Sequence, residues 1–141
     1  MNIKIDHIAL SVSHLEEEIS FYENNFGFRC IDRVVNQSEK LIRCLLEKNG
    51  IKLELFCFDD FNPLPPYRKD LNKDIKTLGT KHFAFQVDDI DLVFAELKKK
   101  GIDLVTDIEK LENGLRYFFI KDPEGIILEI IESKNYNGEV R

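Results

Sequence analysis

The chain has 141 residues, of which 43% are hydrophobic and 33% charged, the composition of one globular domain or of two small modules sharing a core. No apolar run approaches the roughly 20 residues that span a bilayer, and a net charge of −6 argues against nucleic acid as a partner. The first residues lack the apolar segment of a signal peptide, so we expect a cytoplasmic protein. Cys30, Cys44 and Cys57 are expected to be buried free thiols.

The first part of the chain predicts a strand, a helix and three more strands. Polar and apolar residues alternate over much of 3–12, as in a half-buried strand. Ser13 is the expected N-cap of the following helix, and Gly27 its left-handed C-cap. The next strands are predicted at 28–35, 40–47 and 51–58, and Asn49-Gly50 is the hairpin turn between the last two.

The second part repeats this plan after a connector that contains three closely spaced prolines and is expected to be a semi-rigid loop. It predicts, in order, a strand at 81–87, a helix at 89–100, and strands at 104–109, 115–121 and 126–132. The single domain therefore divides into module one (1–58), the connector (59–79), module two (80–133) and a polar tail (134–141).

A repeated pair of polar residues links the two modules. His7 and His82 are 75 residues apart, and so are Glu54 and Glu129, so each His precedes its Glu by the same 47 residues. Further identities share the offset: Ala9 and Ala84, Val12 and Val87, Gly50 and Gly125, Ile51 and Ile126, Leu53 and Leu128. This internal repeat predicts a duplication and an α+β fold of two βαβββ modules.

The alternation of side chains predicts where the repeated residues point. In each first strand the His lies on the face opposite the large apolar residues, and each Glu lies among apolar neighbours, where a carboxylate needs a partner. A lone His or Glu has ordinary structural explanations, but these do not account for both types recurring at one spacing. If the modules form a curved mixed sheet around a shared cavity, two His and two Glu converge there. Such a site suits zinc, nickel, cobalt, manganese or ferrous iron.

Several motifs resemble the vicinal oxygen chelate superfamily, which includes glyoxalase I, methylmalonyl-CoA epimerase, fosfomycin resistance enzymes and extradiol dioxygenases. The resemblance covers nearly the whole chain. It rests on the segments Asp6-His7-Ile8-Ala9-Leu10-Ser11-Val12, Phe21-Tyr22-Glu23-Asn24-Asn25-Phe26-Gly27-Phe28, Lys52-Leu53-Glu54-Leu55-Phe56, Gly79-Thr80-Lys81-His82-Phe83-Ala84-Phe85, and Asp122-Pro123-Glu124-Gly125 leading to Leu128-Glu129.

The resemblance is closest to glyoxalase I, because His7, Glu54, His82 and Glu129 fill all four places of its metal-ligand pattern. It implies one divalent metal per site (Zn, Ni, Co or Mn, with Fe less favoured) and a homodimer that binds a small-molecule substrate. Ser11 departs from the pattern, which has a basic residue there that helps to hold glutathione. The resemblance therefore does not extend to glutathione specificity.

The implied reaction is the isomerisation of a hemithioacetal, or of a similar substrate with vicinal oxygens, by proton transfer through a metal-stabilised enediolate. By position Glu129 resembles the usual base, and pseudo-symmetry makes Glu54 its partner for the opposite face. Two other functions stay open: a non-haem iron dioxygenase and a binding protein of the bleomycin-resistance type. Candidate aromatic walls are Phe56, Tyr67 and Phe119, and candidate anchors for an anionic substrate group are Arg43 and Arg116.

Overall fold

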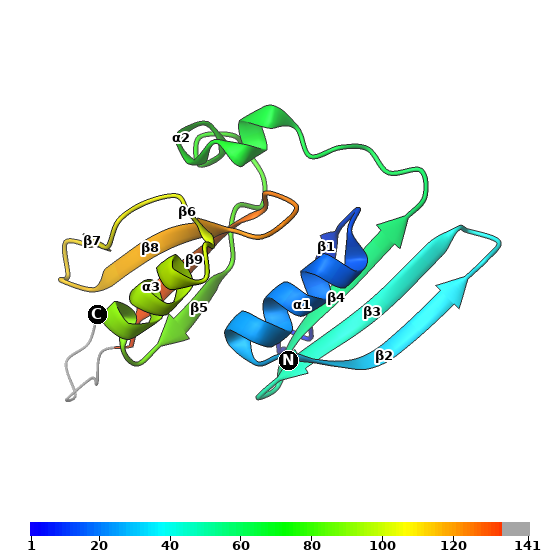
Figure 1. Ribbon diagram of the computed structural model, residues 1–141, viewed down its shortest axis with the longest axis horizontal. Helices are drawn as coiled ribbons and strands as arrows, with labels where there is room; N and C mark the ends of the chain where they lie inside the picture. The colour runs from blue at the N-terminus through cyan, green and yellow to red at the C-terminus, as the bar shows by residue number, and fades with distance from the viewer. Residues whose placement is uncertain (134–141) are drawn as a thin grey trace. The chain divides into compact units, whose positions relative to one another are not determined.

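The computed structural model describes residues 1–133, so the predicted tail (134–141) lies outside the described residues. The chain divides into two compact units, Met1–Pro63 and Leu64–Arg141. Each unit contains one sheet and one long helix (Figure 1), and the α+β prediction of two repeated modules is confirmed. The boundary after Pro63 assigns most of the predicted connector to unit two.

Unit one is a four-stranded sheet with one helix. Its strand order is β1-β4-β3-β2, in which β1 runs parallel to β4 and the other neighbours are antiparallel. The strands β1 and β2 run in the same direction, and helix α1 supplies the long crossover connection that such strands need. The elements are β1 (Ile8–Ser11), α1 (Leu15–Phe26), β2 (Arg29–Asn36), β3 (Leu41–Lys48) and β4 (Ile51–Phe58).

Helix α1 buries one face and ends as predicted but begins differently. Its fully buried Tyr22 packs edge-on against Phe28, with ring centroids 6.0 Å apart. Gly27 adopts the left-handed conformation (φ 72°) expected of a C-cap. The N-cap is His14, not Ser13, and its side chain makes no capping hydrogen bond. The Ser13 hydroxyl instead contacts the His14 ring at 2.9 Å, which removes it from the helix start.

The first predicted strand is too long. Strand β1 begins at Ile8, and Ile3 and Ile5 are 75% and 89% exposed. Alternation alone does not make a strand, because a strand also needs a neighbour for its backbone hydrogen bonds. The hairpin between β3 and β4 is confirmed, since Asn49 and Gly50 both have the positive φ that a two-residue turn of this kind demands.

Unit two repeats the plan with shorter middle strands. The sheet order is β5-β9-β8-β6, with β7 also pairing β8, and β5 runs parallel to β9. Its elements are η1 (Pro66–Lys69), α2 (Leu71–Asp74), β5 (Ala84–Val87), α3 (Ile90–Lys99), β6 (Asp103–Leu104), β7 (Glu109–Lys110), β8 (Arg116–Lys121) and β9 (Ile127–Glu132). The strand predicted at 104–109 is therefore wrong, because two short strands bracket a bend there.

Part of the connector is helical, not the loop expected from its prolines. Pro66 occupies the first turn of η1, a position that tolerates proline, and Asp70 caps α2 by accepting from the Lys73 amide at 3.2 Å. Asp74 is buried, and its carboxylate and carbonyl oxygens both accept from Lys81 Nζ, at 3.4 and 2.6 Å. These contacts fasten α2 to the residues that lead into β5.

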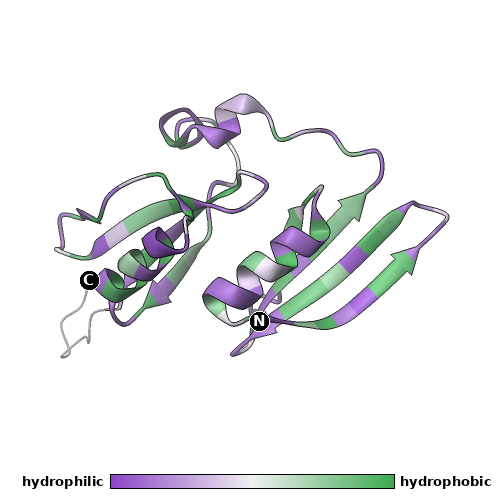
Figure 2. Cartoon of the chain, in the orientation of Figure 1, coloured by the Kyte–Doolittle hydropathy of each residue, from purple (hydrophilic) through white to green (hydrophobic). Residues whose placement is uncertain are grey.

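The hydropathy pattern matches the layers within each unit. In Figure 2 the strands of both sheets carry apolar stretches interrupted by polar residues. Among the described residues, no helix is long and apolar enough to cross a membrane.

Of the three thiols only Cys44 is buried, and this burial raises the pKa of its thiol to about 12. Cys30 is exposed because β2 is an edge strand, so its predicted burial is wrong.

Candidate metal-binding half-sites

The strand register brings each predicted His beside its predicted Glu within one unit. Ala9 lies opposite Glu54 in the parallel β1–β4 pair, and Ala84 lies opposite Glu129 in the parallel β5–β9 pair. Each His is two residues before its Ala and shares its face of the sheet. The two modules therefore place a His–Glu pair on the face away from the helix, at the same register.

Half-site one, defined as His7 and Glu54, has a short polar contact. The Nε2 atom of His7 lies 3.1 Å from Oε2 of Glu54, with side chains 41% and 13% exposed. The other ring nitrogen, Nδ1, lies 2.8 Å from Oδ2 of Asp6. A carboxylate can only accept, so Nδ1 donates to Asp6. This contact orients the ring and directs Nε2 at Glu54.

Two cations accompany half-site one. Arg43 Nη1 donates to Glu54 Oε1 at 3.1 Å, and its Nη2 lies 3.6 Å from Oδ2 of Asp32. Lys52 Nζ lies 3.1 Å from Oδ1 of Asp6. Hydrogen bonds from His7 and Lys52 lower the pKa of the exposed Asp6 carboxyl, which therefore stays ionised at neutral pH as the partner of His7.

Half-site two, defined as His82 and Glu129, repeats the contact in a more aromatic setting. Nε2 of His82 lies 3.1 Å from Oε2 of Glu129, and the side chains are 21% and 14% exposed. The Phe119 ring meets the imidazole edge-on, with centroids 4.9 Å apart and planes at 84°. The Glu129 amide donates to the Phe83 carbonyl at 3.0 Å. The Phe119 ring therefore lies beside this pair, and its role as a wall stays a prediction.

The remaining predicted residues divide between the two faces of each sheet. Phe56 lies two residues beyond Glu54 on the same strand and shares its face of the sheet, and its role as a wall stays a prediction. Arg116 lies on the helix side of β8, where it binds Asp91 of α3 and Glu132. The hydrogen bond to Glu132 and, to a smaller extent, the one to Asp91 raise the pKa of Arg116 above its usual range. Its guanidinium is thus committed to two carboxylates of the protein and does not join half-site two.

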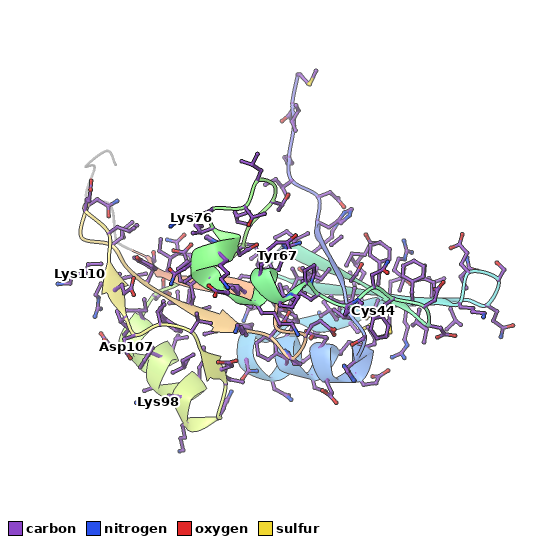
Figure 3. The ribbon with its side chains drawn as sticks, turned by 90° about the horizontal axis from the view of Figure 1, so that it is seen from above. Cys44, Tyr67, Lys76, Lys98, Asp107 and Lys110 are labelled. Atoms are coloured by element: carbon purple, nitrogen blue, oxygen red, sulfur yellow. The ribbon has the colours of Figure 1, made fainter. Side chains whose placement is uncertain are left out.

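The structure also contains a pocket that the sequence did not predict. It has a volume of about 600 Å³ and lies within unit two, between the helical connector and the strands β6 to β8. Its lining is Lys69, Asp70, Leu71, Asn72, Ile75, Val105, Thr106, Glu109, Tyr117 and Phe119. Tyr67 lies in the connector helix η1 (Figure 3), 44% exposed, but does not belong to this lining.

In each pair, the His nitrogen and the Glu oxygen are spaced as two ligands of one metal ion would be. Two donor atoms bound to one ion at ~2.1 Å lie about 3.0 Å apart in octahedral and about 3.4 Å in tetrahedral coordination. The Nε2–Oε2 distance is 3.1 Å in both half-sites. Among residues 1–133, however, no group of three or more His, Cys, Asp or Glu is placed to hold a metal ion. Each unit thus supplies two donors.

Comparisons with known proteins agree with this architecture. The family model described as the Glyoxalase/Bleomycin resistance protein/Dioxygenase superfamily matches residues 4–130. The uncharacterized protein YwkD of Bacillus subtilis is 32% identical over 129 residues, which cover 91% of this chain and 95% of YwkD. Human mitochondrial methylmalonyl-CoA epimerase is 27% identical, covering 90% of this chain and 72% of the epimerase.

A solved structure shares the fold over nearly the whole chain. The glyoxalase family protein from Enterococcus faecalis superposes with a TM-score of 0.78 at 28% identity, covering 92% of this chain and 97% of that protein. The duplicated module, the family model and the similarity to YwkD lead to one assignment. The chain belongs to the Glyoxalase/Bleomycin resistance protein/Dioxygenase superfamily.

Proposed function

We propose that this chain is a divalent-metal-dependent enzyme of the glyoxalase type, which moves a proton between adjacent carbons of a small substrate with vicinal oxygens. The observation that carries the proposal is the repeated His–Glu pair, with the same 3.1 Å contact between the same two atoms in both units. In this proposal the two half-sites hold one ion together, with donors from one chain or from two chains of a homodimer.

The proposed metal would be held by His7, Glu54, His82 and Glu129. These are two imidazoles and two carboxylates, whose charges match that of a divalent ion of the zinc, nickel, cobalt or manganese kind. When bound, the ion would act as a Lewis acid towards the substrate oxygens. Asp6 is not one of the four proposed ligands, but it supports the metal site because its hydrogen bond fixes the orientation of the His7 ring.

We assign the proton transfer to Glu129, with Glu54 as the secondary base. Glu54 already accepts from Arg43 at Oε1, so one of its oxygens is engaged in a charge-assisted hydrogen bond. Among the described residues, the Glu129 carboxylate has a hydrogen-bond or ion-pair partner only in His82, at Oε2. Among the same residues Oε1 of Glu129 therefore has no such partner, whereas Oε1 of Glu54 accepts from Arg43, and this difference favours Glu129 as the base.

A second candidate reaction keeps the same proton chemistry with a different substrate. The similarity to methylmalonyl-CoA epimerase favours an acyl thioester whose α-carbon exchanges a proton. In that reaction the carbonyl of the thioester would replace the carbonyl of the hemithioacetal. Both candidates need the metal site, so they are separated by substrate and not by metal dependence.

Metal titration of the stripped protein is the first test. Calorimetry with nickel, zinc, cobalt and manganese should give about one ion per four-residue site, with affinity strongly reduced in His82→Ala and Glu54→Ala. His14→Ala is the matched control, because His14 is exposed and belongs to neither half-site. Binding that is equally weak in all three variants, or equally strong, would contradict the four-residue site.

Substrate screening then separates the reactions. The metal-loaded protein is offered hemithioacetals of methylglyoxal with several thiols, and acyl thioesters in deuterated water. Isomerisation of a hemithioacetal supports the glyoxalase type, and solvent exchange at the α-carbon of a thioester supports the epimerase type. Tight metal binding with neither activity would overturn the proposed enzyme class.

A further inference from the structure

The pocket of unit two has two walls of different origin. One wall is the helical connector, with Lys69, Asp70 and Ile75 among its residues, and the other is the sheet, with Thr106 and Tyr117 among its residues. The volume of about 600 Å³ lies within the range typical of small-molecule sites, about 300–1,000 Å³. The pocket is therefore large enough for a substrate tail of several heavy atoms.

The connector wall is held in place by the contacts of one buried carboxylate. Asp74, 5% exposed, contacts Lys81 through two oxygens and lies 3.4 Å from Arg68 Nε. Removing one partner of a buried ion pair is costly, so these contacts hold η1 and α2 against the strand that follows. Lys81 directly precedes His82, and the same contacts thus place the connector wall near half-site two.

Phe119 joins the pocket to half-site two. Its ring lines the pocket and also meets the imidazole of His82 edge-on at 4.9 Å. Tyr117 lies next to it on the same face, with ring centroids 5.8 Å apart. A substrate that reacts at His82 and Glu129 can therefore extend along these two rings into the pocket.

The polar groups of the pocket favour a positively charged tail. Tyr117 donates its hydroxyl hydrogen to Glu109 Oε2 at 2.9 Å, and this hydrogen bond raises the pKa of the phenol, which therefore stays neutral. Asp70, Glu109 and Lys69 are the charged residues of the lining. The Asp70 carboxylate accepts from the Lys73 amide and lies 3.8 Å from Lys73 Nζ, so Glu109 is the carboxylate left for a cationic group. The aliphatic stem of Lys69 runs beside Gly125, within 3.4 Å of where a Cβ would stand.

We propose that this pocket binds the non-reacting tail of the substrate, and that the tail is a short apolar chain ending in an amino group. The apolar part would lie on Leu71, Ile75 and Phe119, and the ammonium would contact Glu109. The role as a substrate tail rests on the function proposed above. The binding itself does not require a metal, so the two can be tested separately.

The test uses three probes of equal length on the full chain after removal of metal with a chelator: hexylamine, hexanol and hexanoate. Binding is followed by protein chemical shifts in two-dimensional NMR. Hexylamine should bind about fivefold more tightly than hexanoate, the size expected from one exposed charge contact. The shifts should centre on Tyr117 and Phe119.

Two variants, each of which removes one carboxylate charge, decide whether Glu109 binds the ammonium group. Glu109→Gln should abolish the preference for hexylamine, whereas Glu112→Gln, an exposed carboxylate outside the pocket, should keep it. Equal binding of hexylamine and hexanoate by the wild type, or an unchanged preference in Glu109→Gln, would overturn the pocket proposal.

Turnover separates this proposal from the proposed function. With metal restored, the hemithioacetals of 6-aminohexane-1-thiol and of 6-mercaptohexanoate are compared, and Glu109→Gln should reduce the preference for the amino thiol in kcat/KM about fivefold. Selective hexylamine binding without turnover of either compound would overturn the proposed function and leave the pocket standing. Turnover of both compounds at the same rate would overturn the pocket as a substrate site and leave the function standing.

Discussion

Half-site one and half-site two keep the same pair at the same register but differ in what surrounds it. The residue before His7 is Asp6, which binds the imidazole, whereas the residue before His82 is Lys81, which binds Asp74 of the connector. Leu45 lies opposite Glu54 in the first sheet, and Phe119 lies opposite Glu129 in the second. Two residues earlier on the same strands are Arg43 and Tyr117, respectively.

The two half-sites thus share the features that backbone geometry constrains and differ in the others. The His–Glu contact depends on the parallel pairing of two strands, and a slip of one strand by one residue would turn its member of the pair to the opposite face. The neighbours are side chains that can change without altering the sheet. Half-site one has become charged and half-site two aromatic, and we expect them to contribute unequally to chemistry.

The largest expected effect is on turnover. Glu129→Gln should reduce turnover about 10²–10⁴-fold, the usual contribution of a general base, while metal binding falls less. Glu54→Gln should lose less turnover, because Glu54 is engaged by Arg43. Turnover and metal affinity are measured on both variants, with Glu112→Gln as the charge control. Equal losses of turnover in Glu129→Gln and Glu54→Gln would remove the assigned asymmetry.

The next effect concerns the cores, where the two units should behave alike. Leu53 and Leu128 are equivalent positions, and both are fully buried. Leu53→Ala and Leu128→Ala should each lower the free energy of unfolding by about 2–5 kcal/mol, through lost burial and a residual cavity. Denaturant titration measures this loss.

Leu92→Ala is the control for these core variants. Leu92 is 56% exposed on α3, so its truncation should change the free energy of unfolding by less than about 0.5 kcal/mol. A loss in one unit only would show that the duplicated positions no longer share a core role.

The elements that the sequence predicted best are those defined by local chemistry. Strand β4 matches its predicted range, because Asn49-Gly50 fixes the turn before it. The helix end at Gly27 is also confirmed. The first strand was predicted too long, because alternation around Ile3 and Ile5 reports side-chain pattern but not the presence of a pairing partner. The N-cap was wrong because Ser13 bonds the neighbouring His14 instead.

The site was predictable only where the repeat exposed it. The spacing of 47 residues identified both His–Glu pairs, and the structure brings each pair together. The contact of Arg43 with Glu54 depends on cross-strand register, so the sequence offered Arg43 only as an anchor. The pocket combines connector and sheet residues, and its only sequence signal was Pro66 followed by the capping residue Asp70.

A smaller effect should follow from the outer partner of His7. Asp6→Ala should weaken metal binding about 10–100-fold, because the hydrogen bond that orients the imidazole is lost. Asp6→Asn keeps an acceptor and should lose less. Lys81→Met changes the equivalent residue of module two. Among the described residues Lys81 bonds to Asp74 and not to His82, so this variant should change metal affinity about twofold at most. Similar losses in Asp6→Ala and Lys81→Met would refute the separate roles.

The smallest expected effect comes from Arg43 and has the opposite sign. Its guanidinium lies 3.1 Å from Glu54, and a positive charge near a divalent ion opposes binding by about 1 kcal/mol in a solvent-exposed setting. Arg43→Gln should therefore tighten metal binding about fivefold, while Tyr117→Phe at the equivalent register changes it little. Calorimetry on both variants measures the difference. If Arg43→Gln weakens metal binding instead, the guanidinium serves mainly to orient the Glu54 carboxylate. Its hydrogen bond would then favour metal binding by more than its positive charge opposes it.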